Sequence, residues 1–190
     1  MYFAASGFVA LAVVGTVVYL ATTGSASASV QSAMTTAGCT LKTARATSRQ
    51  HVTSLTAKIK YNTNPPSAGS HYYSPAIWDF YTSPANPIQV VHNEEHGGVI
   101  LWWGNKVPSS TVDELRAFYN SSPDGMLGTP LASLGSRVAI TAWTSPEGSL
   151  GTGHAAVCPT FNEKAFSTFR DAYRGTGPER YPLDLLTPGA

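Results

Sequence analysis

The sequence predicts one small α+β domain with a mixed or antiparallel sheet and two clear helices, preceded by a single N-terminal transmembrane helix. Three observations lead to this prediction. Residues 2–22 are almost wholly apolar, and no charged residue occurs before Lys42. Stretches typical of strands and of helices are then interspersed along the chain, as in α+β domains. The chain has 190 residues, which is enough for one ordinary domain plus an anchor.

The apolar stretch at the N-terminus predicts a membrane anchor. About 20 such residues span the hydrocarbon core of a bilayer as a helix. A cleaved signal peptide is the alternative, because Ala26-Ser27-Ala28 would suit a signal peptidase. The apolar run is longer than a usual signal core and lacks a charged segment before it, which favours an anchor that is retained. We therefore expect residues 1–24 to be the anchor and the small, uncharged residues 25–38 to be a flexible linker.

The predicted domain covers residues 39–180 and begins with a strand and a loop. The stretch 54–61, "SLTAKIKY", alternates apolar with polar residues and predicts a half-buried strand. A loop over 61–75 follows, in which Pro65-Pro66 forces extended backbone. Residues 87–98 predict a short helix with proline in its first turn and Gly97 at its end. The apolar run 98–103 then predicts a buried strand.

Two longer helices are predicted in the second half of the chain. The first covers 111–122 and begins with a capping box made by Thr111 and Glu114. A strand over 136–143 separates it from the second helix, over 160–175, which we expect Thr160 and Glu163 to cap. The aromatic residues of this helix that should face the core are Phe166, Phe169 and Tyr173. Residues 181–190 read as an irregular C-terminal tail.

The charge distribution excludes several classes of function. The formal net charge is +1, from 12 basic and 11 acidic residues, and no basic run occurs. A nucleic-acid partner is therefore not expected. No glycine-rich phosphate loop follows a predicted strand, so a nucleotide cofactor is not expected either. A nucleophilic triad is not indicated, because the chain has no G-x-S-x-G sequence.

The two cysteines, Cys39 and Cys158, do not form a C-x-x-C pair. In an oxidising compartment we expect them to form a disulfide that closes a loop of more than 100 residues. Two unrelated buried thiols are the alternative. An anchor followed by two cysteines able to pair favours a domain on the extracytoplasmic side of a membrane.

The most unusual stretch is "VVHNEEHGGVILWW", at 90–103. His92, Glu95 and His96 match the H-x-x-E-H pattern of inverted zinc proteases. On a helix, the two histidines would share one face and could bind one ion. Gly97 and Gly98 would stop the helix at once, and the chain is small for such an enzyme. These two facts argue against a protease.

Further histidines strengthen the prediction of a metal site. His71 lies in the proline-rich loop, and His51 precedes the first predicted strand. Several imidazoles outside the cytoplasm suit copper or zinc, and intrinsic affinity favours copper. We expect Glu95 to orient a liganding imidazole and Glu94 to be solvated. The alternative is that each histidine donates separately to a carbonyl of a turn.

Several stretches together resemble a bacterial family known only as domain of unknown function 3105. These stretches are "HV" at 51–52, "YNTNPPSAGSHY" at 61–72, "VHNEEHGGVILWW" at 91–103, "ITAW" at 140–143 and "YRGTGPE" at 173–179. The resemblance implies an extracytoplasmic domain, often tethered by one N-terminal helix, and no established activity. The family's histidine motifs correspond here to His51, His71, His92 and His96. His154 lies outside the pattern, and Glu94 stands where the family prefers an apolar residue.

The sequence therefore leads to one main hypothesis and two alternatives. The main hypothesis is a membrane-anchored copper-binding protein that is an accessory subunit or metal donor of a larger membrane complex, such as a copper oxidase or monooxygenase. Other membrane-protein subunits are then its expected partners, and residues 2–22 contact the membrane. The first alternative is a small zinc-dependent hydrolase, with His71, His92 and His96 as ligands and Glu95 activating water. The second is a structural subunit without a metal.

Overall fold

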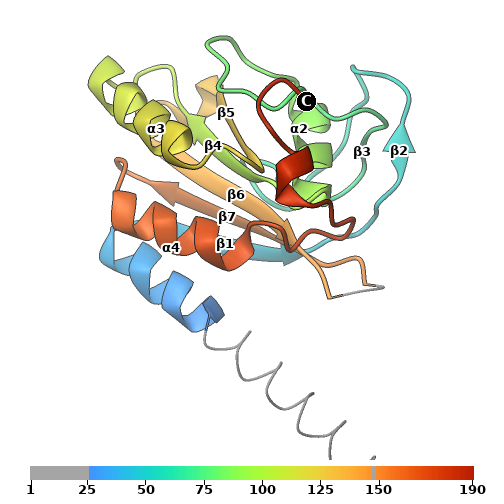
Figure 1. Cartoon of the computed structure of the whole chain (residues 1–190), viewed down its shortest axis with the longest axis horizontal. Helices are drawn as coiled ribbons and strands as arrows, with labels where there is room; N and C mark the ends of the chain where they lie inside the picture. The colour runs from blue at the N-terminus through green and yellow to red at the C-terminus, as the bar shows by residue number, and fades with distance from the viewer. Residues whose placement is uncertain (1–25, 147–148) are drawn as a thin grey trace, which may run out of the picture.

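Residues 26–146 and 149–190 are described by a computed structural model of the protein. They form a five-stranded mixed sheet with helices on both faces (Figure 1). β4 and β5 are parallel, and the other neighbouring strands are antiparallel. The predicted α+β class is confirmed. In sheet order, the strands are β1 (Thr40–Arg45), β7 (Thr152–Cys158), β6 (Val138–Thr144), β4 (Val99–Trp103) and β5 (Met126–Pro130).

The centre of the sheet is buried on both faces. All five residues of β4 are buried, as the apolar run in the sequence predicted. Because side chains alternate across a strand, Leu101 packs against the helices on one face and Trp102 packs on the other. Trp102 donates from Nε1 to the Thr141 hydroxyl on β6 at 2.8 Å, which satisfies its buried polar group.

Two of the helices on the first face were predicted, although not their caps. α4 (Glu163–Tyr173) buries its three aromatic residues, as expected. Its N-cap is Asn162, whose side chain accepts from the Ala165 amide at 3.0 Å, so the predicted cap at Thr160 was wrong. α3 (Ser109–Ser121) begins two residues before the predicted position and has no side-chain cap at Pro108. The predicted capping box was therefore wrong as well.

The flexible linker predicted for residues 25–38 is mostly helical where the structure describes it, from residue 26 on. Residues 26–36 form a helix that packs on the same face as α3 and α4. Val30 and Met34 are fully buried there. Their four-residue spacing puts both side chains on one side of the helix, so they anchor it to the core. Because most residues of this segment are small, the sequence did not indicate the apolar side formed by Val30 and Met34.

The second face of the sheet carries α2 (Pro87–Glu95) and long loops. The Asn86 side chain caps α2 by accepting from the Ile88 amide, and the chain leaves the helix through Gly97 at φ +95°. The short helix predicted here is confirmed. A side chain at Gly97 would be strained by that φ, and its Cβ would lie 2.9 Å from Gly175.

The strand predicted for residues 54–61 is wrong. Exposed and half-buried residues do alternate from 57 to 61, but no strand among the described residues pairs with this stretch. Two shorter segments pair instead, β2 (His51–Val52) and β3 (His71–Tyr72). They run parallel, with His51 opposite His71. This pairing brings together two histidines that are 20 residues apart in the sequence.

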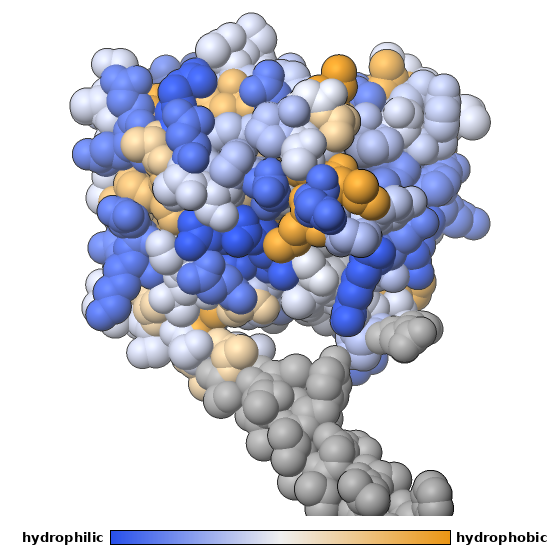
Figure 2. Space-filling model, viewed as in Figure 1, coloured by the Kyte–Doolittle hydropathy of each residue, from blue (hydrophilic) through white to orange (hydrophobic). Residues whose placement is uncertain are grey.

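The C-terminal tail, residues 181–190, is irregular apart from one 3₁₀ turn at Leu183–Leu185. It packs on the second face of the sheet, because Leu186 is buried and its carbonyl accepts from the Gly125 amide at 2.9 Å. Most of the face shown in Figure 2 is hydrophilic, and hydrophobic residues gather where Figure 1 draws this turn in red. Leu185 is exposed there.

The predicted disulfide is confirmed, and it joins Cys39 to Cys158 across 119 residues of sequence. It links the start of β1 to the end of β7, which are antiparallel neighbours. The predicted anchor, residues 1–24, lies outside the described residues. Within 26–146 and 149–190, none of the helices is both long and apolar enough to cross a membrane.

Candidate metal centre

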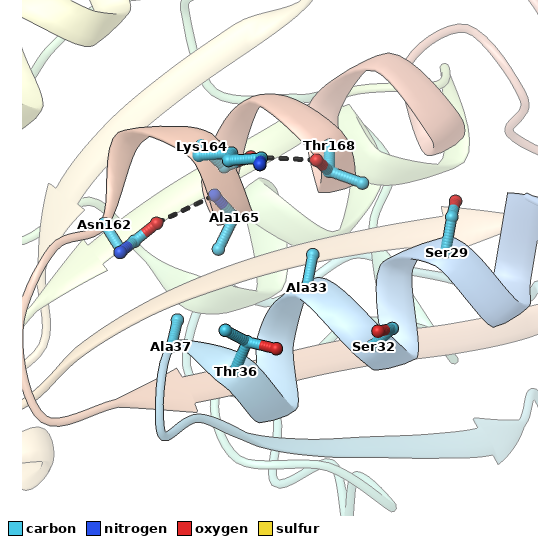
Figure 3. A pocket seen from close by; sticks show the side chains of 9 residues that line it. All are labelled: Ser29, Ser32, Ala33, Thr36, Ala37, Asn162, Lys164, Ala165 and Thr168. Carbon is cyan, nitrogen blue, oxygen red and sulfur yellow. Dashed lines mark hydrogen bonds between the residues drawn. The ribbon is translucent and has the colours of Figure 1, made fainter.

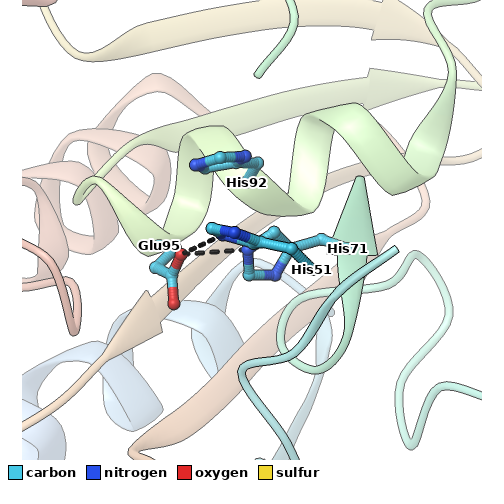
Figure 4. A group of neighbouring side chains, drawn as sticks. All are labelled: His51, His71, His92 and Glu95. Atoms are coloured by element: carbon cyan, nitrogen blue, oxygen red, sulfur yellow. Dashed lines mark ion pairs between the residues drawn. The ribbon is translucent and has the colours of Figure 1, made fainter. Parts of the chain in front are cut away.

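Three elements on the second face of the sheet bring the predicted ligands together. β2 supplies His51, β3 supplies His71, and α2 and its C-terminal end supply His92 and His96. Figure 4 shows His51, His71 and Glu95 close together below α2, with His92 level with the helix. All four predicted ligands belong to this group of side chains, which we call the histidine cluster, together with Glu95.

The spacing within the histidine cluster fits a shared ion. The ring of His71 lies 4.8 Å from that of His51 and 4.7 Å from that of His92, measured between centroids. The Nε2 atoms of His92 and His96 are 3.1 Å apart. Two donors bound to one tetrahedral ion, at about 2.0–2.1 Å each, lie about 3.3 Å from one another. The four-residue spacing on α2 therefore aligns His92 and His96 as predicted.

Backbone carbonyls fix the orientation of two rings. His71 donates from Nδ1 to the Gly69 carbonyl, and His92 donates from Nδ1 to the Tyr72 carbonyl, both at 2.8 Å. Because a carbonyl only accepts, each Nδ1 carries a proton, and in the neutral ring Nε2 has the free lone pair. His71 Nε2 is buried and has no hydrogen bond. Metal-binding histidines are usually held in this way through their other nitrogen.

Glu95 lies inside the histidine cluster. Its Oε2 is 2.9 Å from His71 Nε2 and 3.7 Å from His51 Nε2, although the ring orientation gives no hydrogen bond to His71. Its Oε1 accepts from Arg49 Nε at 2.7 Å. Burial alone would raise the pKa of Glu95, but the close contact with His71 and the hydrogen bond and positive charge of Arg49 outweigh it and lower the pKa to about 2. Glu95 is thus an ionised carboxylate that can ligate directly.

The two histidines of α2 are neutral at neutral pH. Burial, together with the weaker effect of the neighbouring His71 and His96 rings, lowers the pKa of His92 to about 4, although the hydrogen bond to the Tyr72 carbonyl opposes this in part. Burial also lowers the pKa of His96, more than the nearby Glu179 and Glu95 carboxylates raise it. Neutral imidazole is the form that binds metals.

Sequence reasoning missed three neighbours of the histidine cluster. Arg49 stands two residues before His51 and belongs to no motif. Glu179 Oε2 lies 3.6 Å from His96 Nε2, and the Tyr181 ring lies 4.4 Å from the His96 ring. The position of Glu179 at the end of "YRGTGPE" was the available signal. Gly177 permits this approach, because a Cβ there would lie 2.3 Å from the Glu95 carbonyl oxygen.

Glu94 is not solvated, which corrects the prediction. Its side chain is fully buried, and neither carboxyl oxygen has a hydrogen-bond partner. Burial raises the pKa of Glu94 well above its usual value, and a loose contact with the Thr141 hydroxyl, too poor in geometry for a hydrogen bond, opposes this only in part. The carboxyl group is therefore neutral and outside the histidine cluster.

His154 is the only one of the five histidines outside the histidine cluster, as predicted. It stacks on Tyr173 of α4, with ring centroids 4.2 Å apart. A pocket of about 430 Å³ also lies on the α4 side of the sheet, between α4 and the helix over 26–36 (Figure 3). Small side chains such as Ala33 and Ser29 line it, and it offers no metal ligands.

The model of one protein family, described as "Protein of unknown function (DUF3105)", matches residues 51–182. The chain belongs to this family. The part that matches the DUF3105 model contains every residue of the histidine cluster, from His51 to His96, and also Glu179. The helix over 26–36 and Cys39 precede it. No curated protein and no solved structure gives a significant match to this DUF3105 protein.

Proposed function

We propose that this protein binds copper in the histidine cluster. The observation that carries the proposal is the orientation of His71 and His92. Each ring is held through Nδ1 by a backbone carbonyl, so that its Nε2 lone pair faces the other ligands. A buried acceptor without a partner destabilises a fold by about 1–3 kcal/mol. A metal ion would satisfy His71 Nε2, and it would also bind His92 Nε2 and the Glu95 carboxylate, which now contact His96 and Arg49.

The donor set favours copper, with zinc as the alternative. Four imidazoles and one carboxylate form a nitrogen-rich site, which suits copper, zinc and nickel better than magnesium or calcium. Among divalent ions of the first transition row, copper has the highest intrinsic affinity for such ligands. The negative charge of Glu95 would offset part of the charge of the ion.

The contacts of Glu95 argue for metal binding rather than hydrolysis. A general base must be free to take a proton from water. Here Oε1 accepts from Arg49, and Oε2 faces His71. The H-x-x-E-H sequence also lies at the very end of a helix of nine residues. Both facts suit a ligand or an orienting group better than a catalytic base.

We further propose that the protein is held at the extracytoplasmic side of a membrane by residues 2–22. The disulfide between Cys39 and Cys158 supports this location, because disulfides persist in oxidising compartments. The apolar N-terminal residues support the anchor. A metal-binding domain tethered in this way would be an accessory subunit or copper donor of a larger membrane complex.

Metal analysis of the purified protein tests the proposal. After incubation with Cu²⁺ and removal of free ions, the wild type is expected to retain one copper per chain by elemental mass spectrometry. His71→Ala and His92→Ala should lose it. His154→Ala is the matched control, because it removes the histidine outside the histidine cluster, and it should keep copper. If the wild type retains none, or if all three variants retain it, the histidines are structural.

A further inference from the structure

The potential ligands form two overlapping groups. His51, His71, His92 and Glu95 form the inner group, and His92, His96 and Glu179 form the outer group. Within each group, the ligand atoms lie within 4.8 Å of one another. His92 is the one residue that belongs to both. The groups come from different parts of the chain, since β2 and β3 complete the first and the segment after α4 completes the second.

The shared ligand means that the two groups cannot both be filled through His92. Its Nδ1 donates to the Tyr72 carbonyl, which leaves only Nε2 to bind a metal. A neutral imidazole nitrogen has one lone pair, so Nε2 binds one ion at a time. The two groups therefore fit alternative positions of one ion better than two sites that both use His92.

Exposure distinguishes the two positions. The side chains of His71 and Glu95 are 0% and 2% exposed, whereas those of His96 and Glu179 are 13% and 46% exposed. The outer group thus faces solvent through Glu179, whereas the inner group reaches solvent only at His51, whose side chain is 47% exposed. The backbone amide of Glu179 donates to the Glu95 carbonyl at 2.9 Å, which ties the outer ligand directly to α2.

We propose that copper is taken up at the outer group and moves to the inner group by ligand exchange, while it stays bound to His92. The bonds to His96 and Glu179 break as bonds to His71 and Glu95 form, with no change in oxidation state. The reverse sequence releases copper to a partner. This inference rests on the proposed copper binding and adds the route by which the ion reaches the inner group.

The proposal makes a kinetic prediction that a simple four-histidine site does not make. A residue that binds the ion only in transit changes the rates of uptake and release by the same factor and leaves the affinity unchanged. Glu179→Gln should therefore slow both rates by about tenfold, a typical effect of weakening a metal contact. His71→Gln should instead weaken the affinity, because it removes a ligand of the final position.

Stopped-flow measurements on the full chain test this prediction. Cu²⁺ uptake is followed by tryptophan quenching, and release is followed by transfer to a chelator in excess. Glu114→Gln is the matched control, since it removes the same charge from an exposed position on α3. It should leave both rates and the affinity unchanged, and wild-type protein should bind one ion.

Four results would overturn the route. They are two copper ions per chain, unchanged rates in Glu179→Gln, a loss of affinity in that variant, or slower exchange in His51→Ala alone. The last result would place uptake at the side of His51, whose side chain is 47% exposed. Wild-type protein that binds no copper would instead refute the proposed function itself, so the two failures can be told apart.

Discussion

His154 should make the fold sensitive to acid. The residue is 7% exposed, and Nδ1 of its ring has no hydrogen-bond partner. Burial lowers its pKa from 6.5 to about 4. Between these two pH values the unfolded chain binds a proton that the folded chain does not, so stability falls as the pH falls. The difference between the two pKa values corresponds to about 3 kcal/mol.

The variant His154→Phe should remove this sensitivity. Phenylalanine keeps an aromatic ring against Tyr173 but cannot take up a proton. The substitution also removes the contact between the His154 ring and the Thr144 hydroxyl, which should destabilise the protein equally at every pH. Urea unfolding of metal-free protein between pH 7 and pH 4.5 gives the free energy of unfolding. As the pH falls from 7 to 4.5, the free energy of unfolding of the variant should rise by about 2–3 kcal/mol relative to that of wild type. If the free energy of unfolding changed with pH in the same way in both proteins, the reasoning would be refuted.

Three further predictions concern stability at neutral pH. Met34→Ala should lower the free energy of unfolding by about 2–5 kcal/mol, because it opens a cavity beneath the helix over 26–36; a loss under 1 kcal/mol would contradict the packing of that helix. Reducing the bond between Cys39 and Cys158 should cost about 4–5 kcal/mol by chain entropy, seen as an earlier urea midpoint. Glu94→Leu should stabilise the protein at pH 7 by about 1–3 kcal/mol, because it removes an unpaired carboxyl group that the unfolded chain ionises freely. That gain should shrink as the pH approaches 4.5, and a destabilised variant at pH 7 would reject the buried, neutral state of Glu94.

Local patterns were sufficient to predict the elements whose own sequence carries a continuous or periodic apolar signal. The apolar run at 98–103 gave β4, and the aromatic spacing of 166, 169 and 173 gave the inner side of α4. They failed where pairing decides the structure. Residues 54–61 have a strand pattern but no partner, whereas β2 and β3 are two residues long and exist through their mutual pairing. Such short segments carry no periodic signal.

The histidines of the site could be predicted, but not its acidic and basic neighbours. The spacing of His92 and His96 is local and follows from helical geometry. Arg49 and Glu179 reach the site through tertiary packing, which no local pattern encodes. Glu94 was misplaced for a related reason. α2 is covered on both sides, by the sheet and by β3, so a polar residue on it need not face solvent.

The central claim is that imidazoles of the histidine cluster bind copper. Electron paramagnetic resonance of the protein loaded with one equivalent of Cu²⁺ tests it most directly. The account predicts hyperfine coupling to several imidazole nitrogens, which His154→Ala should preserve and His92→Ala should reduce or abolish. A copper signal without nitrogen coupling, or a spectrum that is identical in His92→Ala and wild type, would contradict it.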